Sequence, residues 1–312
     1  MQDPKLPRGI VPLFETPFLE NGSIDYDSLP RLIEFSIREG VNGLTAPLVA
    51  SEVQALSKDE REQIVTIAAK AIAGRVPFIV GASAEDPGIC RFFARLTEKV
   101  GATAYLVAVP NALYGQTDQL LAYFRSITEA SAAPIVIQDL QWNGPGMDLD
   151  TMRRLRDALP ALVGLKIETV PAGAKYTVVR EAFGPGFYIS GGWAVPQLIE
   201  ALDRGVDAMI PECALTRVYA AIYRAYSSGN RDEATRIFRE LIPVLVFSNQ
   251  ELYHSVAFFK RMLVRKGLLK SARLRSPGYS WDRYSLRMAD EIIDYYLALE
   301  ARYAPDSQTS AV

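Results

Sequence analysis

Histidine is nearly absent from this sequence of 312 residues, which contains only His254. One histidine cannot build a metal site of several histidines or a histidine pair for proton transfer. Cysteine is scarce as well, and Cys90 and Cys213 fit no spacing of metal ligands. Two isolated thiols are typical of a reducing compartment rather than of a disulfide framework. We therefore expect no metal site.

A basic segment and a long apolar run are also missing. Charged residues make up 22% of the chain, and the net charge is −2. This balance argues against nucleic acid or an anionic membrane surface as a partner. No segment approaches the ~18 consecutive apolar residues of a membrane span, and residues 1–5 contain no apolar signal core. The sequence thus predicts a soluble, cytoplasmic protein.

Apolar residues make up 49% of the chain and occur in eight short runs, each followed by a segment of helical periodicity. The expected strands lie at 9–18, 43–48, 76–81, 103–109, 134–138, 161–168, 187–190 and 206–210. The expected helices lie at 25–39, 57–73, 86–100, 117–131, 148–159, 172–183, 195–203 and 216–228. The runs are continuously apolar, as in parallel strands buried on both faces. Eight such units within residues 1–230 predict an α/β protein with an eight-fold β/α (TIM) barrel.

The competing architecture is a doubly wound open sheet. It usually carries a glycine-rich phosphate turn after the first strand, and this sequence has none there. After Gly229 and Asn230 the strand pattern ends, and residues 231–304 predict an extension of three helices, at 231–247, 251–266 and 285–303. Residues 305–312 are polar and predict a frayed tail.

Lys166 lies near the end of the sixth expected strand, inside an apolar run. Lysine is seldom placed in such a run without a partner or a task. At the carboxyl rim of a barrel, an amine held out of bulk water can attack the carbonyl carbon of a substrate. Glu168, two residues on, projects to the same side of the strand. It is either an acid/base that relays a proton or the other half of a structural ion pair.

Several further segments carry a resemblance: 12–18 with 22–25, 40–43, 56–61, 77–82, 164–166, 190–191, and 259–260 followed by Gly267. Together they resemble the dihydrodipicolinate synthase and N-acetylneuraminate lyase family of lysine-dependent class I lyases, over nearly the whole chain. The resemblance implies a β/α barrel with a helical extension, assembled as a homo-oligomer (a tetramer or a dimer). It also implies that Lys166 forms a Schiff base with a 2-oxo acid, so that no metal and no organic cofactor are needed.

The sequence departs from this family at several site positions. The family's hydroxyl-rich segment for the 2-oxo acid carboxylate aligns with residues 48–52, where Ser51 is the one hydroxyl. Its catalytic tyrosine aligns with Gln138, and no arginine lies near Asn143, where the synthases bind a second carboxylate. Dihydrodipicolinate synthesis and simple sialic acid cleavage are therefore not expected.

A different branch of the family fits the segment around the lysine better. Lys166 is followed by Glu168 two residues on and then by Pro171. This arrangement is similar to divergent members that dehydrate 2-keto-3-deoxy sugar acids.

Other candidates lie near the ends of the fourth and fifth strands. Asp139 either replaces the missing tyrosine as a proton shuttle or is an ordinary polar residue at the barrel rim. Gln138 can donate or accept a hydrogen bond but does not titrate. Tyr114, in the loop after the fourth strand, is a candidate for the missing phenol.

Substrate contacts are expected from small and hydroxyl-bearing residues. Ser51 and the backbone N–H groups around Ala50 form a candidate cradle for a carboxylate, although serine also commonly caps helices. Thr16 either hydrogen-bonds within the site or ends the first strand. Ser190 and Gly191 leave room for a substrate chain, but a tight turn explains them equally well.

The expected activity is that of a carbon–carbon or carbon–oxygen lyase, an aldolase or a dehydratase. An iminium on Lys166 would withdraw electrons from C3 of the substrate, which permits C3–C4 cleavage or loss of a C3 proton followed by β-elimination. Two alternatives remain open. The altered site also fits a degenerate barrel that binds a 2-oxo or sugar acid as a sensor. Residues 185–186 and 190–192, near the late strands, also fit a phosphate-binding barrel enzyme. The lack of a basic cluster beside them disfavours this alternative.

Overall fold

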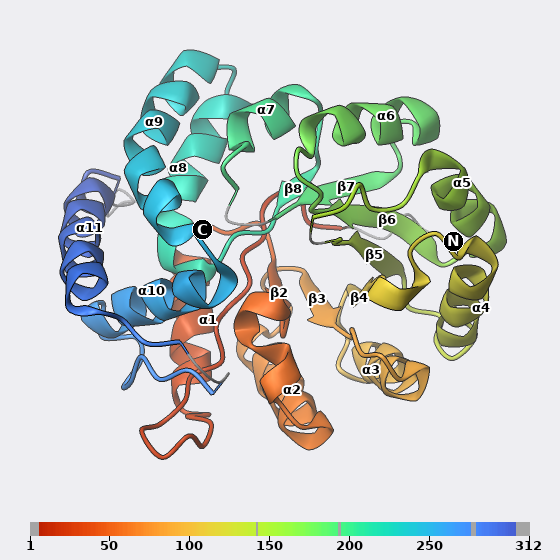
Figure 1. Cartoon of the computed structure of the whole chain (residues 1–312), viewed down its shortest axis with the longest axis horizontal. Coiled ribbons are helices and arrows are strands. Elements are labelled where there is room, and N and C mark those ends of the chain that lie inside the picture. Colours follow the sequence, from red (N-terminus) through yellow and green to blue (C-terminus); the bar gives the residue numbers. More distant parts are fainter. Residues whose placement is uncertain (1–5, 142, 193–194, 276–278, 304–312) are drawn as a thin grey trace.

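The computed structural model of the chain describes residues 6–141, 143–192, 195–275 and 279–303. Within these ranges eight parallel strands lie in the order β1-β8-β7-β6-β5-β4-β3-β2. They are β1 (Gly9–Ile10), β2 (Leu44–Ala46), β3 (Phe78–Gly81), β4 (Ala104–Ala108), β5 (Ile135–Asp139), β6 (Leu162–Ile167), β7 (Tyr188–Gly191) and β8 (Ala208–Met209). A parallel bridge between Leu13 and Thr45 closes the sheet. The fold is the eight-fold β/α barrel that the sequence predicted (Figure 1).

One helix follows each strand in the described part of the chain, and these helices surround the barrel (Figure 1). They are α1 (Ser28–Arg38), α2 (Lys58–Ile72), α3 (Pro87–Lys99), α4 (Thr117–Thr128), α5 (Leu149–Ala158), α6 (Gly173–Phe183), α7 (Leu198–Asp203) and α8 (Thr216–Ser227). The sequence defines several of their starts. Ser57 and Glu60 form a capping box at α2, and Asp148 accepts a backbone hydrogen bond at the start of α5. These side chains satisfy N–H groups that the first turn leaves unpaired.

The first and last strands are shorter than the sequence indicated. The expected strands at 9–18 and 206–210 contract to β1 and β8, each of two residues. Pro12 and Pro211 follow closely, and proline has no N–H to continue a ladder. Beyond them the pairing continues as isolated bridges, of which one joins Leu13 to Glu212.

Side chains along each strand alternate between the barrel interior and the helix layer. The interior cluster contains Val11, Leu13, Leu48, Ile79, Ala104, Leu106, Val136, Tyr188, Ala208 and Ile210. The strand register places Gln138, Lys166 and Ser190 opposite one another on β5, β6 and β7. These three residues therefore form one layer near the carboxyl ends of the strands, whereas Leu165 and Ile167 belong to the outer core.

Three more described helices follow the barrel: α9 (Arg231–Ser248), α10 (Leu252–Arg265) and α11 (Arg283–Ala301). Helix α10 packs against two short 3₁₀ helices, η1 (Val49–Ser51) and η4 (Cys213–Leu215), which follow β2 and β8. A buried ion pair joins Lys260 of α10 to Glu52 at 2.5 Å. Helix α10 therefore lies beside the carboxyl ends of the strands. The tail expected at 305–312 lies outside the described residues.

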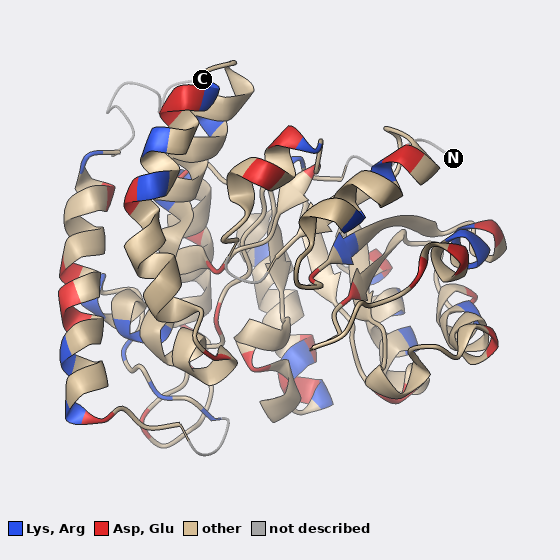
Figure 2. Ribbon diagram, turned by 45° about the horizontal axis from the view of Figure 1, so that its top comes forward, with Lys and Arg blue, Asp and Glu red and all other residues tan. Residues whose placement is uncertain are grey.

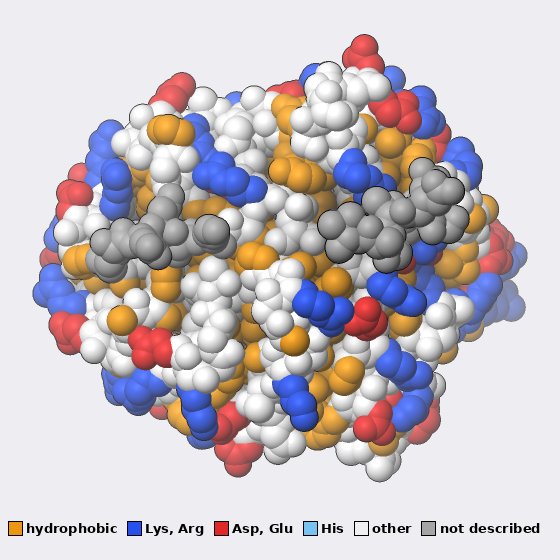
Figure 3. Space-filling view, turned by 180° about the vertical axis from the view of Figure 1, so that it is seen from behind, with side chains coloured by type: hydrophobic (Ala, Val, Ile, Leu, Met, Phe, Trp, Pro, Cys, Tyr) orange, Lys and Arg blue, Asp and Glu red, His pale blue; other side chains and the backbone are white. Residues whose placement is uncertain are grey.

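Charged residues lie mostly on the helices and loops rather than on the barrel strands (Figure 2). On the face seen from behind, basic, acidic and hydrophobic side chains are interspersed (Figure 3). No helix in the described ranges is long and apolar enough to cross a membrane.

Candidate active site

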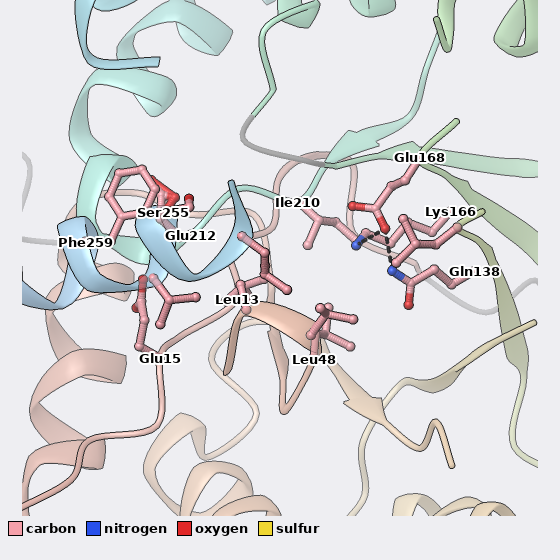
Figure 4. A pocket seen from close by; sticks show the side chains of 15 residues that line it. Leu13, Glu15, Leu48, Gln138, Lys166, Glu168, Ile210, Glu212, Ser255 and Phe259 are labelled. Atoms are coloured by element: carbon pink, nitrogen blue, oxygen red, sulfur yellow. Dashed lines mark hydrogen bonds and ion pairs between the residues drawn. The ribbon is translucent and has the colours of Figure 1, made fainter. Parts of the chain in front are cut away.

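The centre of the site is a contact between Lys166 and Glu168. The amine Nζ lies 2.8 Å from Glu168 Oε2. The Gln138 amide donates a hydrogen bond to the same oxygen (Figure 4). Lys166 is 3% exposed and Glu168 8% exposed, so bulk water does not screen the contact. The two-residue spacing directs both side chains to the interior, as the sequence indicated.

A glycine on the neighbouring strand end makes room for this pair. A Cβ atom at Gly192 would lie 2.1 Å from Glu168 Oε1 and 2.9 Å from Lys166 Cε. Gly191, the residue expected to leave room for a substrate, faces the other way, because its Cβ would meet the Tyr176 hydroxyl at 2.3 Å. Ser190 is fully buried in the same interior layer as Lys166.

The Lys166–Glu168 pair lines one end of a cavity at the carboxyl ends of the strands (Figure 4). Apolar side chains line its middle, among them Leu13, Leu48 and Ile210. Ala50 also lines it, and α10 contributes four side chains: Leu252, Ser255, Val256 and Phe259. The cavity thus has a polar reactive end and an apolar middle, and it is closed on one side by the helical extension.

Two carboxyl groups, Glu15 and Glu212, also line the cavity, on the side away from Lys166 (Figure 4). They are 1% and 6% exposed. Burial raises the pKa of Glu15 from 4.5 to about 7, although the Cys213 thiol donates a hydrogen bond to Glu15 Oε2 at 3.1 Å. Burial also raises the pKa of Glu212 well above its usual value, and the nearby Glu15 raises it further. These carboxyl groups hold their protons at a higher pH than ordinary glutamates.

Asp139 and Tyr114 meet outside the cavity. The Tyr114 hydroxyl donates to Asp139 Oδ1 at 3.1 Å, and Lys175 of α6 lies 2.5 Å from Asp139 Oδ2. The backbone N–H of Met147 also donates to Asp139. Burial raises the pKa of Tyr114, and the adjacent Asp139 charge adds to the rise. The structure therefore assigns Asp139 to an ion pair between β5 and α6, away from the Lys166 amine.

The hydroxyl residues after β1 and β2 bond to the backbone. The Ser51 hydroxyl donates to the Phe14 carbonyl at 2.7 Å and accepts from the Leu48 N–H at 3.1 Å. The Thr16 hydroxyl donates to the Ser51 carbonyl at 2.6 Å. These bonds tie the β1 and β2 loops together and occupy both hydroxyl groups. Ser51 is the last residue of η1 rather than its N-cap, so its hydroxyl joins two loops instead of capping a helix, and Thr16 bonds to the backbone of the same segment.

Groups of three or more His, Cys, Asp or Glu side chains that could hold a metal ion do not occur among the described residues. The polar chemistry of the described cavity comes from the lysine, the glutamine amide, the serine hydroxyl and three carboxyl groups. Such a set can form an imine, transfer protons and hydrogen-bond a polar ligand.

The fold and this cavity define a class: a β/α barrel with a buried lysine–glutamate pair at the carboxyl ends of its strands. The profile of the Dihydrodipicolinate synthetase family matches residues 6–293. The chain therefore belongs to this family, whose members are lyases, and the resemblance noted in the sequence is confirmed.

Individual relatives differ in the reactions that their names give. The chain is 32% identical over 245 residues to the 4-hydroxy-tetrahydrodipicolinate synthase of Rhizobium meliloti (strain 1021), covering 76% of this chain and 81% of the relative. It is 26% identical over 278 residues to the L-2-keto-3-deoxyarabonate dehydratase of Azospirillum brasilense, covering 86% and 88%. The crystal structure of dihydrodipicolinate synthase from Rhodopseudomonas palustris is similar with a TM-score of 0.83 at 28% identity, covering 94% and 97%.

Several residues of the site were not predicted from the sequence. Glu212 and the α10 side chains belong to this group, and so does Lys175, the partner of Asp139. A signal for Glu15 and Glu212 does exist, since each is a carboxylate placed shortly after an apolar strand run. The α10 contribution has no such signal, because it depends on how the extension packs against the barrel.

Proposed function

We propose that this chain is a class I lyase that dehydrates a 2-keto-3-deoxy sugar acid through a Schiff base on Lys166. The observation that carries the proposal is the buried contact between the Lys166 amine and the Glu168 carboxylate. An amine alone can form an imine, but elimination also needs a group that moves protons beside C3 and C4 of the substrate. Glu168 supplies that group in this proposal, and its contact with the Lys166 amine supports the assignment.

The first step joins Lys166 to the C2 carbonyl carbon. The amine nitrogen forms a bond to C2, and the C2 oxygen leaves as water with protons supplied through Glu168. The resulting iminium withdraws electrons from C3, so the Glu168 carboxylate can remove a C3 proton and leave an enamine. The Gln138 amide orients Glu168 for this transfer through the hydrogen bond to Oε2.

The second step removes the C4 hydroxyl. The enamine electrons form the C3–C4 double bond while the C4–O bond breaks, and the proton held by Glu168 leaves with the hydroxyl as water. Water then hydrolyses the iminium and frees Lys166. Aldol cleavage would pass through the same iminium. The similarity to a 2-keto-3-deoxy sugar acid dehydratase over 86% of the chain favours elimination.

Borohydride reduction in the presence of pyruvate tests the covalent step. Peptide mass spectrometry should locate the reduced adduct on Lys166, with the buried Lys260 and Lys266 as internal controls in the same digest. A folded protein that forms no adduct with any 2-oxo acid would contradict the proposal. An adduct without turnover would favour the sensor alternative.

Product analysis tests the reaction. Incubation with 2-keto-3-deoxypentonates and 2-keto-3-deoxyhexonates should yield dehydrated products that retain all of the substrate carbons. Release of pyruvate and an aldehyde would instead show C3–C4 cleavage.

A further inference from the structure

Two carboxyl groups share the cavity with Lys166 but form no ion pair with it. Glu15 follows β1, and Glu212 follows β8, the strand that pairs with β1. Glu212 itself pairs through its backbone with Leu13. The two acids therefore lie on adjacent strand ends, and both line the cavity. Figure 4 shows them on the side opposite Lys166, beyond Leu13, Leu48 and Ile210.

The oxygens of these carboxyl groups are largely without partners. Glu15 Oε1 and both oxygens of Glu212 are buried and accept no well-formed hydrogen bond in the described part of the protein, although the backbone N–H groups of Glu212 and Leu215 lie near enough to lower the pKa of Glu212. Nearby cations are already engaged: Lys260 contacts Glu52, and Lys266 contacts Glu300, each at 2.5 Å. Buried polar atoms are rarely left unsatisfied, and such atoms in a cavity indicate a ligand or solvent that completes their bonds.

A hydroxyl group reaches the same end of the cavity from α10. Ser255 is 8% exposed and lines the cavity beside Glu212 (Figure 4). The structure shows no hydrogen bond from its hydroxyl to any described residue. Two acids and one hydroxyl from three separate elements thus converge on one region. The raised pKa of each acid supports a partly protonated pair, which both donates and accepts hydrogen bonds.

We propose that Glu15, Glu212 and Ser255 form a subsite for the hydroxyl-bearing, uncharged far end of the substrate, and that this subsite rejects a second carboxylate. The inference rests on the proposed function, because the 2-oxo end must be held at Lys166. A sugar hydroxyl donates to one carboxyl oxygen and accepts from a protonated one, whereas a second carboxylate would lose its hydration next to two acids. Arginine is absent from the described lining of the cavity, so no guanidinium is available there to pair with a second carboxylate.

Two substrates of equal length test this subsite: a 2-keto-3-deoxyaldonate that ends in CH2OH, and its counterpart that ends in a carboxylate. We expect the wild-type enzyme to prefer the hydroxyl-terminated acid by at least about 100-fold in kcat/KM, because the subsite would have to bury an unpaired charge to bind the other. Turnover of the dicarboxylate at an equal or higher rate would overturn the inference, as would preference for an amine-terminated 2-oxo acid.

Near-isosteric variants test whether these side chains cause the preference for the hydroxyl-terminated acid. Glu15→Gln and Glu212→Gln should each lower the preference by at least about tenfold, because an uncharged amide tolerates a carboxylate. Ser255→Ala should raise KM for the hydroxyl-terminated acid several-fold, in line with a lost hydrogen bond of about 1 kcal/mol. Glu181→Gln is the control, since Glu181 is exposed on α6 and does not line the cavity. An unchanged preference in folded Glu15→Gln and Glu212→Gln variants would overturn the inference.

The covalent step separates this inference from the proposed function. Pyruvate has no far end, so borohydride trapping of pyruvate on Lys166 should remain at the wild-type level in all three cavity variants. Loss of trapping in the wild-type protein would overturn both ideas. Normal trapping and turnover with no preference between the two far ends would overturn the subsite alone.

Discussion

Lys166 Nζ lies 2.8 Å from Glu168 Oε2, and the two residues are two positions apart on one stretch of chain. The contact is local in sequence, so the geometry of a strand is enough to bring the two groups together. Its chemical value comes from burial, because an amine and a carboxylate exchange protons with a substrate most effectively where water is excluded. The predictions below test that contact and its surroundings.

Glu168→Gln removes the proton-transfer group while keeping the size of the side chain. We expect kcat for dehydration to fall about 10²–10⁴-fold, the usual contribution of general acid–base catalysis. Steady-state kinetics on a 2-keto-3-deoxy sugar acid measures the effect, and Glu181→Gln, on the exposed side of α6, is the control. Retention of kcat within a few-fold would remove Glu168 from the mechanism.

Gly192→Ala should displace the Glu168 carboxylate, because the new Cβ would lie 2.1 Å from Oε1. We expect kcat/KM to fall at least about tenfold, since misplacement of catalytic groups by ~1 Å is costly. Gly186→Ala is the matched control, because no atom of a described residue lies within 4 Å of its Cβ position. Equal activity in the two variants would show that Glu168 has freedom to move.

Asp139→Asn tests a structural role against a role as proton shuttle. Asp139 is fully buried and contacts Lys175, so loss of its charge should lower the free energy of unfolding by about 3 kcal/mol. Because the residue lies outside the cavity, kcat should change by no more than a few-fold. Denaturant unfolding and steady-state kinetics measure the two quantities. A large fall in kcat in a stable variant would restore the shuttle hypothesis.

Glu15 should make the protein less stable as the pH rises. Its pKa is raised from 4.5 to about 7 by burial, with Cys213 and Lys260 lowering it and Glu52 raising it. The folded state therefore binds the proton more tightly than the unfolded state, and the free energy of unfolding falls between pH 4.5 and about 7. The shift corresponds to on the order of 3 kcal/mol.

Urea unfolding across this pH range checks the expectation, with Glu15→Gln as the comparison. The variant should show a flatter profile than the wild type. Since Glu15 and Glu212 interact, the apparent midpoint belongs to the pair rather than to either acid. A stability that rises with pH in the wild type, or an identical profile in the variant, would contradict the raised pKa.

The sequence by itself determined the barrel and the identity of the central pair. Continuous apolar runs that alternate with segments of helical periodicity are a local signal, so the eight strand–helix units could be recognised from the sequence. The lengths of β1 and β8 could not be predicted in this way. The order Lys166, Ile167, Glu168 likewise places the two side chains on one side of a strand through backbone geometry alone.

Tertiary structure decided which of the other candidates meet the pair. Gln138 and Asp139 are neighbours in sequence, yet one reaches Glu168 and the other reaches Lys175, because successive strand residues face opposite sides. Glu15, Glu212 and Ser255 are far apart in the chain and converge only because β1 pairs with β8 and α10 packs beside them. Long-range packing of this kind leaves no periodic trace in the sequence, which is why the convergence of these residues at the far end of the cavity became visible only in the folded protein.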